Sequence, residues 1–329
     1  MPTPLSIAVL SFWHVHAPDY SRAAQQHPGT RLAAVWDDDE ARGRAGAERF
    51  STEYTPDLDA LLARDDIDAV VITTATADHR DIMLKAIAAG KHVFTEKLLA
   101  PTVDEAEEII KAANEAGVIL FVSLPRLYEG RTLAIMRAIG EGKLGELTYT
   151  RVRMAHDGWI GNWLPDRFAD PKAAIGGALA DLGCHPAYLT QLFLGSTPQT
   201  VTATYSRVTG RQVEDNAVVT ASYANGAIGV FEASNVTVPG AYTLELRGTE
   251  GSILFGFGSQ KLLAKGDHFD KEDWIELEAD EDESDPFTQW VAHIGAGTIP
   301  QSNLRAAVAL TRLVVAANES ASSGRAIDY

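Results

Sequence analysis

Short apolar runs alternate with helix-like stretches through the first 124 residues of this 329-residue chain, and this alternation constrains the fold more than any other feature. Runs such as 6–10 and 69–74 are apolar almost throughout, as expected for strands buried on both faces. We expect strands at 6–10, 31–36, 69–74, 92–96 and 118–123, and helices at 18–26, 40–50, 57–63, 80–89 and 103–116. This alternation predicts an α/β fold with a parallel, doubly wound sheet.

The rest of the chain has a different pattern. After a helix at 131–139, we expect strands at 146–155, 200–208, 216–223, 228–234 and 242–248, then helices from about 286 and at 304–320, the last starting at Asn303. Because this length exceeds one typical core, we predict two domains, 1–124 and 125–329. The second would be an α/β domain with an open mixed, mainly antiparallel sheet. Its open face would expose Val, Tyr and Phe, which predicts a homodimer or homotetramer.

The composition limits the partners of the chain. A formal net charge of −17 argues against nucleic acids and anionic membranes, since both would repel it. A single cysteine excludes an internal disulfide and suits a reducing compartment, so we expect a cytoplasmic protein. The apolar run 5–13 lacks a basic flank and is too short to span a bilayer, so we interpret it as the first strand. The acidic stretch 267–285 is expected to be a solvated loop or edge.

Ligands of doubly wound sheets bind at the carboxyl ends of the strands, where this chain carries an acidic residue. Asp37 follows the second strand. A carboxylate there would bind the ribose hydroxyls of NAD and repel the 2′-phosphate of NADP. A solvated acidic turn is the alternative.

The first turn departs from the G-x-G-x-x-G pattern of dinucleotide-binding folds, because residues 11–16 are Ser-Phe-Trp-His-Val-His. We expect Ser11, Phe12, Trp13 and His14 to line the cofactor site, with Trp13 obstructing the approach of a pyrophosphate to the backbone. The two histidines and Trp13 could face the nicotinamide and the substrate. Aromatic packing at a domain junction is the alternative.

The segment 176–185 combines two glycines with an acid and a histidine. Asp181 and His185 are four residues apart, so a helix would place them on one face. A carboxylate beside an imidazole suits proton transfer to or from a hydroxyl, although this spacing also occurs by chance. The glycine pair is expected to form a bend that leaves room for a ligand. Cys184 would point about 100° away from His185, so we expect a small packed side chain.

Two further features would bear on a substrate. Lys97 ends the fourth strand, where an ammonium could stabilise a developing alkoxide, although a lone lysine is more often a solvated surface charge. The connection 156–177 holds Trp159, Trp163 and Arg167, and aromatic rings beside charged groups often bind sugars. A loop pinned by its own tryptophans is the alternative. We expect no metal site, because His14, His16, His79 and His185 show no ligand spacing.

Two of these segments resemble the Gfo/Idh/MocA oxidoreductases, the relatives of glucose–fructose oxidoreductase and inositol dehydrogenase. Residues 89–97 match the first nine positions of the family pattern A-G-K-H-V-x-x-E-K-P. The pattern G-G-G-x-L-x-D-x-G-x-H is matched by Gly176, Gly177, Leu179, Asp181, Gly183 and His185. Residues 246–252 also resemble the family sequences, but more weakly. The sequence departs from the family at the glycine fingerprint and at Leu98, which replaces the proline after Lys97.

The resemblance implies a dinucleotide-binding Rossmann domain, then a substrate-binding and oligomerisation domain. It implies that Lys97 is the catalytic lysine, Asp181 a substrate ligand and His185 the acid/base. Thr74 and His79 match the T-P-x-x-x-H segment of the family, with Ala75 in place of proline. We place these last two and Glu96 with Lys97 in the cofactor site. The predicted substrate-binding residues are Arg126, His156, Trp163, Asp181 and His185.

Together these features predict an NAD-preferring dehydrogenase of a cyclic sugar, sugar derivative or polyol. Two alternatives stay open. The same site could hold NAD tightly and oxidise its substrate only transiently, enabling epimerisation, elimination or glycoside cleavage. The chain could also be a non-catalytic sensor on the same fold, although such a binder has no need of Lys97, Asp181 and His185.

Overall fold

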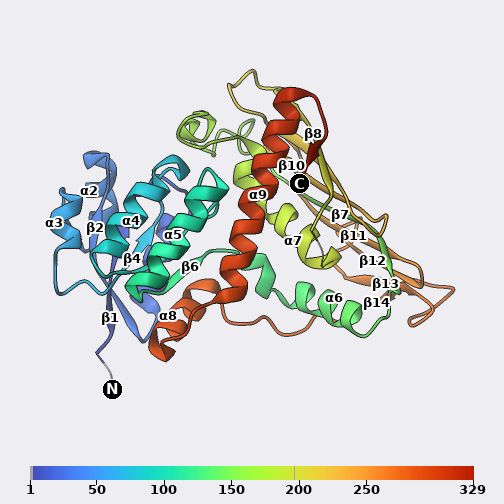
Figure 1. Cartoon of the computed structure of the whole chain (residues 1–329), viewed down its shortest axis with the longest axis horizontal. Helices are drawn as coiled ribbons and strands as arrows, with labels where there is room; N and C mark the ends of the chain where they lie inside the picture. Colours follow the sequence, from blue (N-terminus) through green and yellow to red (C-terminus); the bar gives the residue numbers. More distant parts are fainter. Residues whose placement is uncertain (1–2, 196) are drawn as a thin grey trace. The chain divides into compact units, whose positions relative to one another are not determined.

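The computed structural model describes residues 3–195 and 197–329, which form two compact units (Figure 1). Unit 1 comprises the chain up to Leu124 together with Ser284–Thr311. Unit 2 comprises Pro125–Glu283 and Arg312–Tyr329. Residues 284–311, which the sequence prediction assigned to the second domain, therefore belong to the first unit.

Unit 1 is built on a parallel sheet of six strands in the order β3-β2-β1-β4-β5-β6. The strands are β1 Leu5–Leu10, β2 Thr30–Trp36, β3 Glu53–Tyr54, β4 Ala69–Ile72, β5 His92–Thr95 and β6 Leu120–Val122. The helices are α1 Ala17–Gln26, α2 Glu40–Arg49, α3 Leu58–Leu62, α4 His79–Ala88, α5 Val103–Ala116 and α8 Pro286–Ala296. This confirms the predicted doubly wound fold. The two-residue strand β3 was not predicted.

Side chains from the C-terminal part of the sequence complete the β6 edge of this sheet. The indole of Trp290 on α8 packs against Phe94 and donates a hydrogen bond to the carbonyl of Ile119 at 3.2 Å. Asn303 accepts from the N–H of Val122 at 2.9 Å and donates to its carbonyl at 2.8 Å. The prediction that Asn303 starts a helix is wrong, because α9 Gln301–Ser323 already begins two residues earlier. Its amide instead pairs with β6.

Unit 2 contains a mixed sheet of nine strands in the order β14-β13-β12-β11-β7-β10-β9-β8-β15. These strands are β7 Leu147–Ala155, β8 Thr200–Ser206, β9 Asn216–Ser222, β10 Ile228–Ser234, β11 Ala241–Gly248, β12 Gly251–Phe255, β13 Leu263–Gly266, β14 Ile275–Glu276 and β15 Ile327–Asp328. Strands β7 and β10 pair in parallel and the other strand pairs among the described residues are antiparallel, which confirms the predicted sheet. Helix α7 Cys184–Leu194 packs on β7 and β10, and α6 Gly130–Gly140 precedes β7 (Figure 1).

The acidic stretch is more than a solvated edge. Asp282 accepts a hydrogen bond from the N–H of Gly130 at the start of α6, and Asp280 pairs with Arg137 on the same helix. Asp285 accepts from the N–H groups of Phe287 and Thr288 and so caps α8. None of the described helices is long and apolar enough to span a membrane.

Candidate functional site

The loop after β1 is held by its own backbone and by Asp37. Ser11 lies in the left-handed region with a φ of 76°, a conformation that glycine adopts most easily. Its Oγ accepts a hydrogen bond from the N–H of Trp13 at 3.0 Å, and the N–H of Phe12 donates to Asp37 at 2.6 Å. The N–H of His14 donates to the carbonyl of Thr73 at 3.0 Å. Ser11 therefore takes a turn conformation where the fingerprint has its first glycine.

The Phe12 ring packs inside unit 1 against α2. The centroid of this ring lies 6.0 Å from that of Phe50. A Cβ added to Gly46 would lie 2.5 Å from the nearest ring atom of Phe12. Trp13 is buried as well. These contacts resemble the predicted aromatic packing. A contact of either residue with a cofactor stays a prediction.

Asp37 is buried, and its carboxylate has partners within unit 1. It accepts from the N–H of Asp39 at 3.0 Å and from Nε of Arg42 at 2.9 Å, besides the Phe12 N–H. Burial alone would raise the pKa of Asp37, but the hydrogen bonds from Arg42 and the backbone lower it below the usual value. Arg42 also pairs with Asp38 at 2.7 Å. Any ribose hydroxyl that binds Asp37 would therefore share the carboxylate with Arg42.

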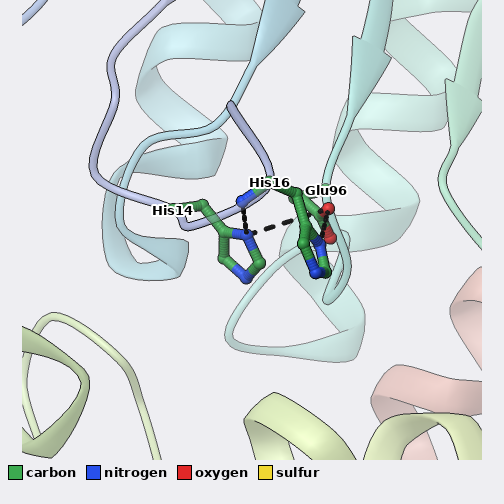
Figure 2. A group of neighbouring side chains, drawn as sticks. All are labelled: His14, His16 and Glu96. Carbon is green, nitrogen blue, oxygen red and sulfur yellow. Dashed lines mark hydrogen bonds and ion pairs between the residues drawn. The ribbon is translucent and has the colours of Figure 1, made fainter. Parts of the chain in front are cut away.

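Figure 2 shows that His14 and His16 from the first loop lie beside Glu96 at the end of β5. The Nδ1 atoms of His16 and His14 lie 2.7 and 3.8 Å from Oε1 of Glu96. That oxygen accepts from the Tyr20 hydroxyl at 2.5 Å, and Oε2 accepts from the N–H of Lys97 at 3.0 Å. Burial alone would raise the pKa of Glu96, but the two histidines hold it well below its usual range.

The donor atoms of His14, His16 and Glu96 lie within 4.8 Å of one another, a spacing that a transition metal could use. The sequence prediction of no metal site rested on spacing along the chain, which does not show that the first loop meets the end of β5. His79 and His185 are not part of this group. The Glu96 carboxylate is already hydrogen-bonded on both oxygens, so we assign no metal to it.

The carboxyl ends of β4 and β5 bring together further predicted residues. Lys97 is 4% exposed and is joined to Leu98 by a cis peptide bond. Nδ1 of His79 lies 2.8 Å from the Leu98 carbonyl, and burial lowers the pKa of His79, so this ring is neutral and donates from Nδ1. Thr74 Oγ1 and His79 Nε2 are buried with no hydrogen-bond partner among the described residues. Orphaned polar atoms at this edge fit a polar ligand such as NAD.

In unit 2, Asp181 and His185 do not lie on one regular α-helix. Residues Leu179–Gly183 form a π-helical turn, and α7 begins at Cys184. The expectation of a plain helical i, i+4 pair is therefore wrong in its geometry. Such π turns are rare and occur frequently at functional sites.

Glu214, which the sequence analysis did not select, holds this turn. Its Oε1 accepts from the N–H groups of Gly177 and Leu179 at 2.9 and 3.0 Å, and its carbonyl accepts from the N–H of Ala178. A Cβ on Gly177 would lie 2.0 Å from that carbonyl oxygen. The room that the glycine provides is thus taken by the backbone of Glu214 and not, as expected, by a ligand.

His185 has a partner one turn later on α7. Its Nδ1 lies 2.9 Å from the hydroxyl oxygen of Tyr188. The same oxygen accepts a hydrogen bond from the backbone N–H of Arg126 at 3.1 Å. Cys184 is buried, as expected, and its thiol donates to the Asp181 carbonyl at 3.1 Å.

The two tryptophans of the 156–177 connection behave differently. Trp159 is buried beneath the guanidinium of Arg211. This agrees with the alternative in which the tryptophan holds its own loop in place. Trp163 is 51% exposed, its Nε1 donates to Asp157 at 2.9 Å, and its ring lies 4.7 Å from that of His156. Burial lowers the pKa of His156 despite the charge of Asp181.

Arg126 and Arg167 occupy different surroundings in unit 2. Arg126 pairs with Glu129 and lies 5.2 Å from the ring centroid of Tyr242. Arg167 lies over the ring of its neighbour Phe168 at 5.9 Å.

The structure thus brings the predicted residues together in two sets. In unit 1 these are Ser11, Phe12, Trp13, His14, Asp37, Thr74, His79, Glu96 and Lys97, all at or next to the carboxyl ends of strands. In unit 2, Tyr188 links Arg126 to His185, and the charge of Asp181 acts on His156 beside Trp163. Sequence reasoning missed Arg42, Tyr188 and Glu214. The spacing of His185 and Tyr188 on one helix face was the available signal for Tyr188.

Comparison with known proteins identifies the family. Residues 14–124 match an "Oxidoreductase family, NAD-binding Rossmann fold", and residues 132–254 match the "GFO/IDH/MocA C-terminal domain". The chain belongs to the Gfo/Idh/MocA oxidoreductases. It is 32% identical to the 1,5-anhydro-D-fructose reductase of Ensifer adhaerens over 235 residues, 69% of this chain and 68% of the relative. It is 29% identical to the scyllo-inositol 2-dehydrogenase (NAD(+)) of Bacillus subtilis, over 74% and 72% of the two chains.

A solved structure supports the same assignment. GenD2 from gentamicin A biosynthesis, crystallised in complex with NAD, superposes with a TM-score of 0.85 at 28% identity. The match covers 100% of this chain and 97% of GenD2. The chain is therefore an NAD-binding oxidoreductase, as the sequence predicts.

Proposed function

We propose that this oxidoreductase moves a hydride between NAD and a hydroxyl-bearing carbon of a cyclic sugar, sugar derivative or polyol. The observation that carries the proposal is Lys97, a buried lysine side chain two residues after the end of β5 in an NAD-binding unit. The names of the two curated relatives, a reductase of an anhydro sugar and a dehydrogenase of an inositol, support the substrate class.

Residues of unit 1 would hold the cofactor. Thr74 and His79 offer polar atoms that have no hydrogen-bond partner within the part of the chain that the structure describes, and the backbone of the first loop replaces the glycine fingerprint. When bound, NAD supplies the hydride acceptor. We propose a preference for NAD over NADP, because Asp37, Asp38 and Asp39 outnumber the single guanidinium of Arg42 where a 2′-phosphate would bind.

The remaining predicted residues would act on the sugar. Lys97 and His185 share the two tasks of the reaction, which are to move the hydroxyl proton and to stabilise charge on the oxygen. Asp181 orients the substrate. Trp163 offers a half-exposed ring beside His156 on which an apolar sugar face can stack, and Arg126 adds a charged donor. We also propose a cytoplasmic homo-oligomer that associates through the open face of the unit 2 sheet.

Binding and turnover test the proposal together. Calorimetry with NAD, NADH and NADP is expected to give micromolar binding of NAD and at least about tenfold weaker binding of NADP. A screen of cyclic sugars and polyols, followed by nicotinamide absorbance, is expected to find a substrate. Lys97→Met should lower kcat about 100-fold or more, a far larger effect than its effect on the Kd for NAD.

Three results would contradict parts of the proposal. An absence of NAD binding would remove the oxidoreductase activity altogether. Product formation without a net change in nicotinamide absorbance would favour tightly bound NAD that is oxidised and reduced within one turnover. Turnover of Lys97→Met within about tenfold of the wild type would remove the assigned role of this lysine.

A further inference from the structure

We propose that Tyr188 is a positioning residue that fixes the tautomer of His185, so that this imidazole donates a hydrogen bond from Nε2 to the substrate oxygen. The two side chains of this pair, His185 and Tyr188, both lie in unit 2. The consequence of the tautomer for catalysis rests on the proposed function.

The two side chains form a preorganised pair. His185 and Tyr188 are three residues apart on α7 and therefore share one face of the helix. Nδ1 of His185 lies 2.9 Å from the Tyr188 hydroxyl oxygen, and the rings meet edge to face with centroids 5.6 Å apart. Both are buried, with 8% and 2% of their surfaces exposed. Water therefore has little access to either polar atom of the pair.

The direction of the hydrogen bond follows from counting protons on the hydroxyl. Among the described residues, the Tyr188 oxygen has two hydrogen-bond partners, His185 Nδ1 and the backbone N–H of Arg126 at 3.1 Å. An amide N–H can only donate, so it uses an acceptor position of the hydroxyl. The single O–H proton of Tyr188 is then left with one acceptor, Nδ1 of His185.

Burial raises the pKa of Tyr188 well above its usual value, so the hydroxyl keeps its proton at neutral pH. If Nδ1 carried a proton instead, the buried O–H of Tyr188 would lose its acceptor, which is unfavourable. Nδ1 therefore accepts, and a neutral His185 carries its proton on Nε2.

This tautomer changes the catalytic roles that the sequence analysis gave to His185 and Lys97. A protonated Nε2 donates to an oxygen and stabilises negative charge that develops on it, as an oxyanion-hole group does. It has no lone pair to take a proton from a hydroxyl. In oxidation, the proton of the substrate O–H group would then pass to the other residue of the proposed function, through the side-chain nitrogen of Lys97.

Nitrogen NMR of the full-length protein labelled with ¹⁵N-histidine reads the tautomer directly. The signals of His185 are assigned by their disappearance in His185→Gln. We expect an unprotonated Nδ1 and a protonated Nε2 in the wild type, and a mixture of both tautomers in Tyr188→Phe. The matched control is Tyr205→Phe, which removes a half-buried hydroxyl that bonds to Asn318 and should leave the His185 signals unchanged.

A protonated Nδ1 in the wild type, or His185 signals that do not change in Tyr188→Phe, would overturn the proposal. The spectrum needs no substrate, so this result is independent of whether the sugar activity is found.

Kinetics test the catalytic consequence once a substrate is known. Glutamine can donate from its amide but cannot act as a base, whereas leucine can do neither. We expect kcat of His185→Gln to exceed that of His185→Leu by at least about tenfold. We also expect the pH profile of His185→Gln to keep the acidic limb of the wild type. Equal losses in the two variants, or loss of that limb in His185→Gln, would assign the proton to His185 and overturn the exchange of roles.

Discussion

At Glu96, burial and neighbouring positive charge act on one pKa in opposite directions. Burial favours the protonated carboxyl, but His14 and His16 favour the anion and hold the pKa well below its usual value. A carboxyl whose pKa is lower in the folded than in the unfolded state stabilises the fold at pH values above the unfolded pKa, about 4.3. This contribution is lost as the pH falls through the lower, folded-state pKa.

Glu96→Gln should therefore lower the free energy of unfolding at about pH 7 by roughly 1–3 kcal/mol, because it replaces a buried carboxylate that is hydrogen-bonded to Tyr20 and to the N–H of Lys97. The difference from the wild type should narrow as the pH falls below about 4. Urea unfolding at a series of pH values measures both. Glu115→Gln, an exposed position on α5, is the control and should change stability by less than about 0.5 kcal/mol. A difference for Glu96→Gln that does not depend on pH would contradict the lowered pKa of Glu96.

Among single elements, the π-helical turn of unit 2 depends on the absence of one methyl group. A Cβ on Gly177 would overlap the carbonyl oxygen of Glu214 at 2.0 Å, so the backbone must shift. Gly177→Ala should lower stability by about 1–3 kcal/mol and reduce kcat by displacing Asp181 and His185. Gly140→Ala is the matched control, because no atom lies within 4 Å of its added Cβ, and it should be neutral or stabilising by about 0.5–1 kcal/mol. If Gly177→Ala and Gly140→Ala had the same effect on stability, the overlap at Gly177 would be relieved with no loss of free energy.

The same elements show what the sequence could predict. The β4 run 69–72 is apolar throughout and lies within a predicted strand, because local periodicity reports burial. Asn303 was misplaced because its partner, Val122, is 181 residues away in the sequence. The proposed reactive residues Lys97, Asp181 and His185 were selected by motif. Glu214 was missed because it bonds to Gly177 and Leu179 across more than 30 residues, which leaves no local pattern. Arg42 and Tyr188 lie only 5 and 3 residues from Asp37 and His185, so their spacing offered a signal that the sequence analysis did not use.

For the molecule as a whole, the open face of the unit 2 sheet is more polar than the sequence suggested. The register places Thr220, Val230, Arg151 and Glu245 side by side across four strands. Arg151 pairs with Glu232 at 3.0 Å, whereas Phe231, on the other face of β10, is fully buried. The expected exposure of phenylalanine is therefore wrong. Threonine, valine and paired charges form a flat surface of the kind that suits a specific, moderately polar interface.

If two or four copies meet on this face, light scattering after gel filtration should give a mass that is two or four times 35.4 kDa. Val218 lies on the face between Thr204 and Glu232 and is 44% exposed. Val218→Arg places a long charged side chain at the centre of the contact and should shift the protein to a monomer at micromolar concentration. The same change at Val208, which is 70% exposed after β8, should leave the mass unaltered. A monomeric wild type, or an unchanged mass of Val218→Arg, would place the contact elsewhere or remove it, since a stable interface of ordinary size does not tolerate an unpaired buried charge.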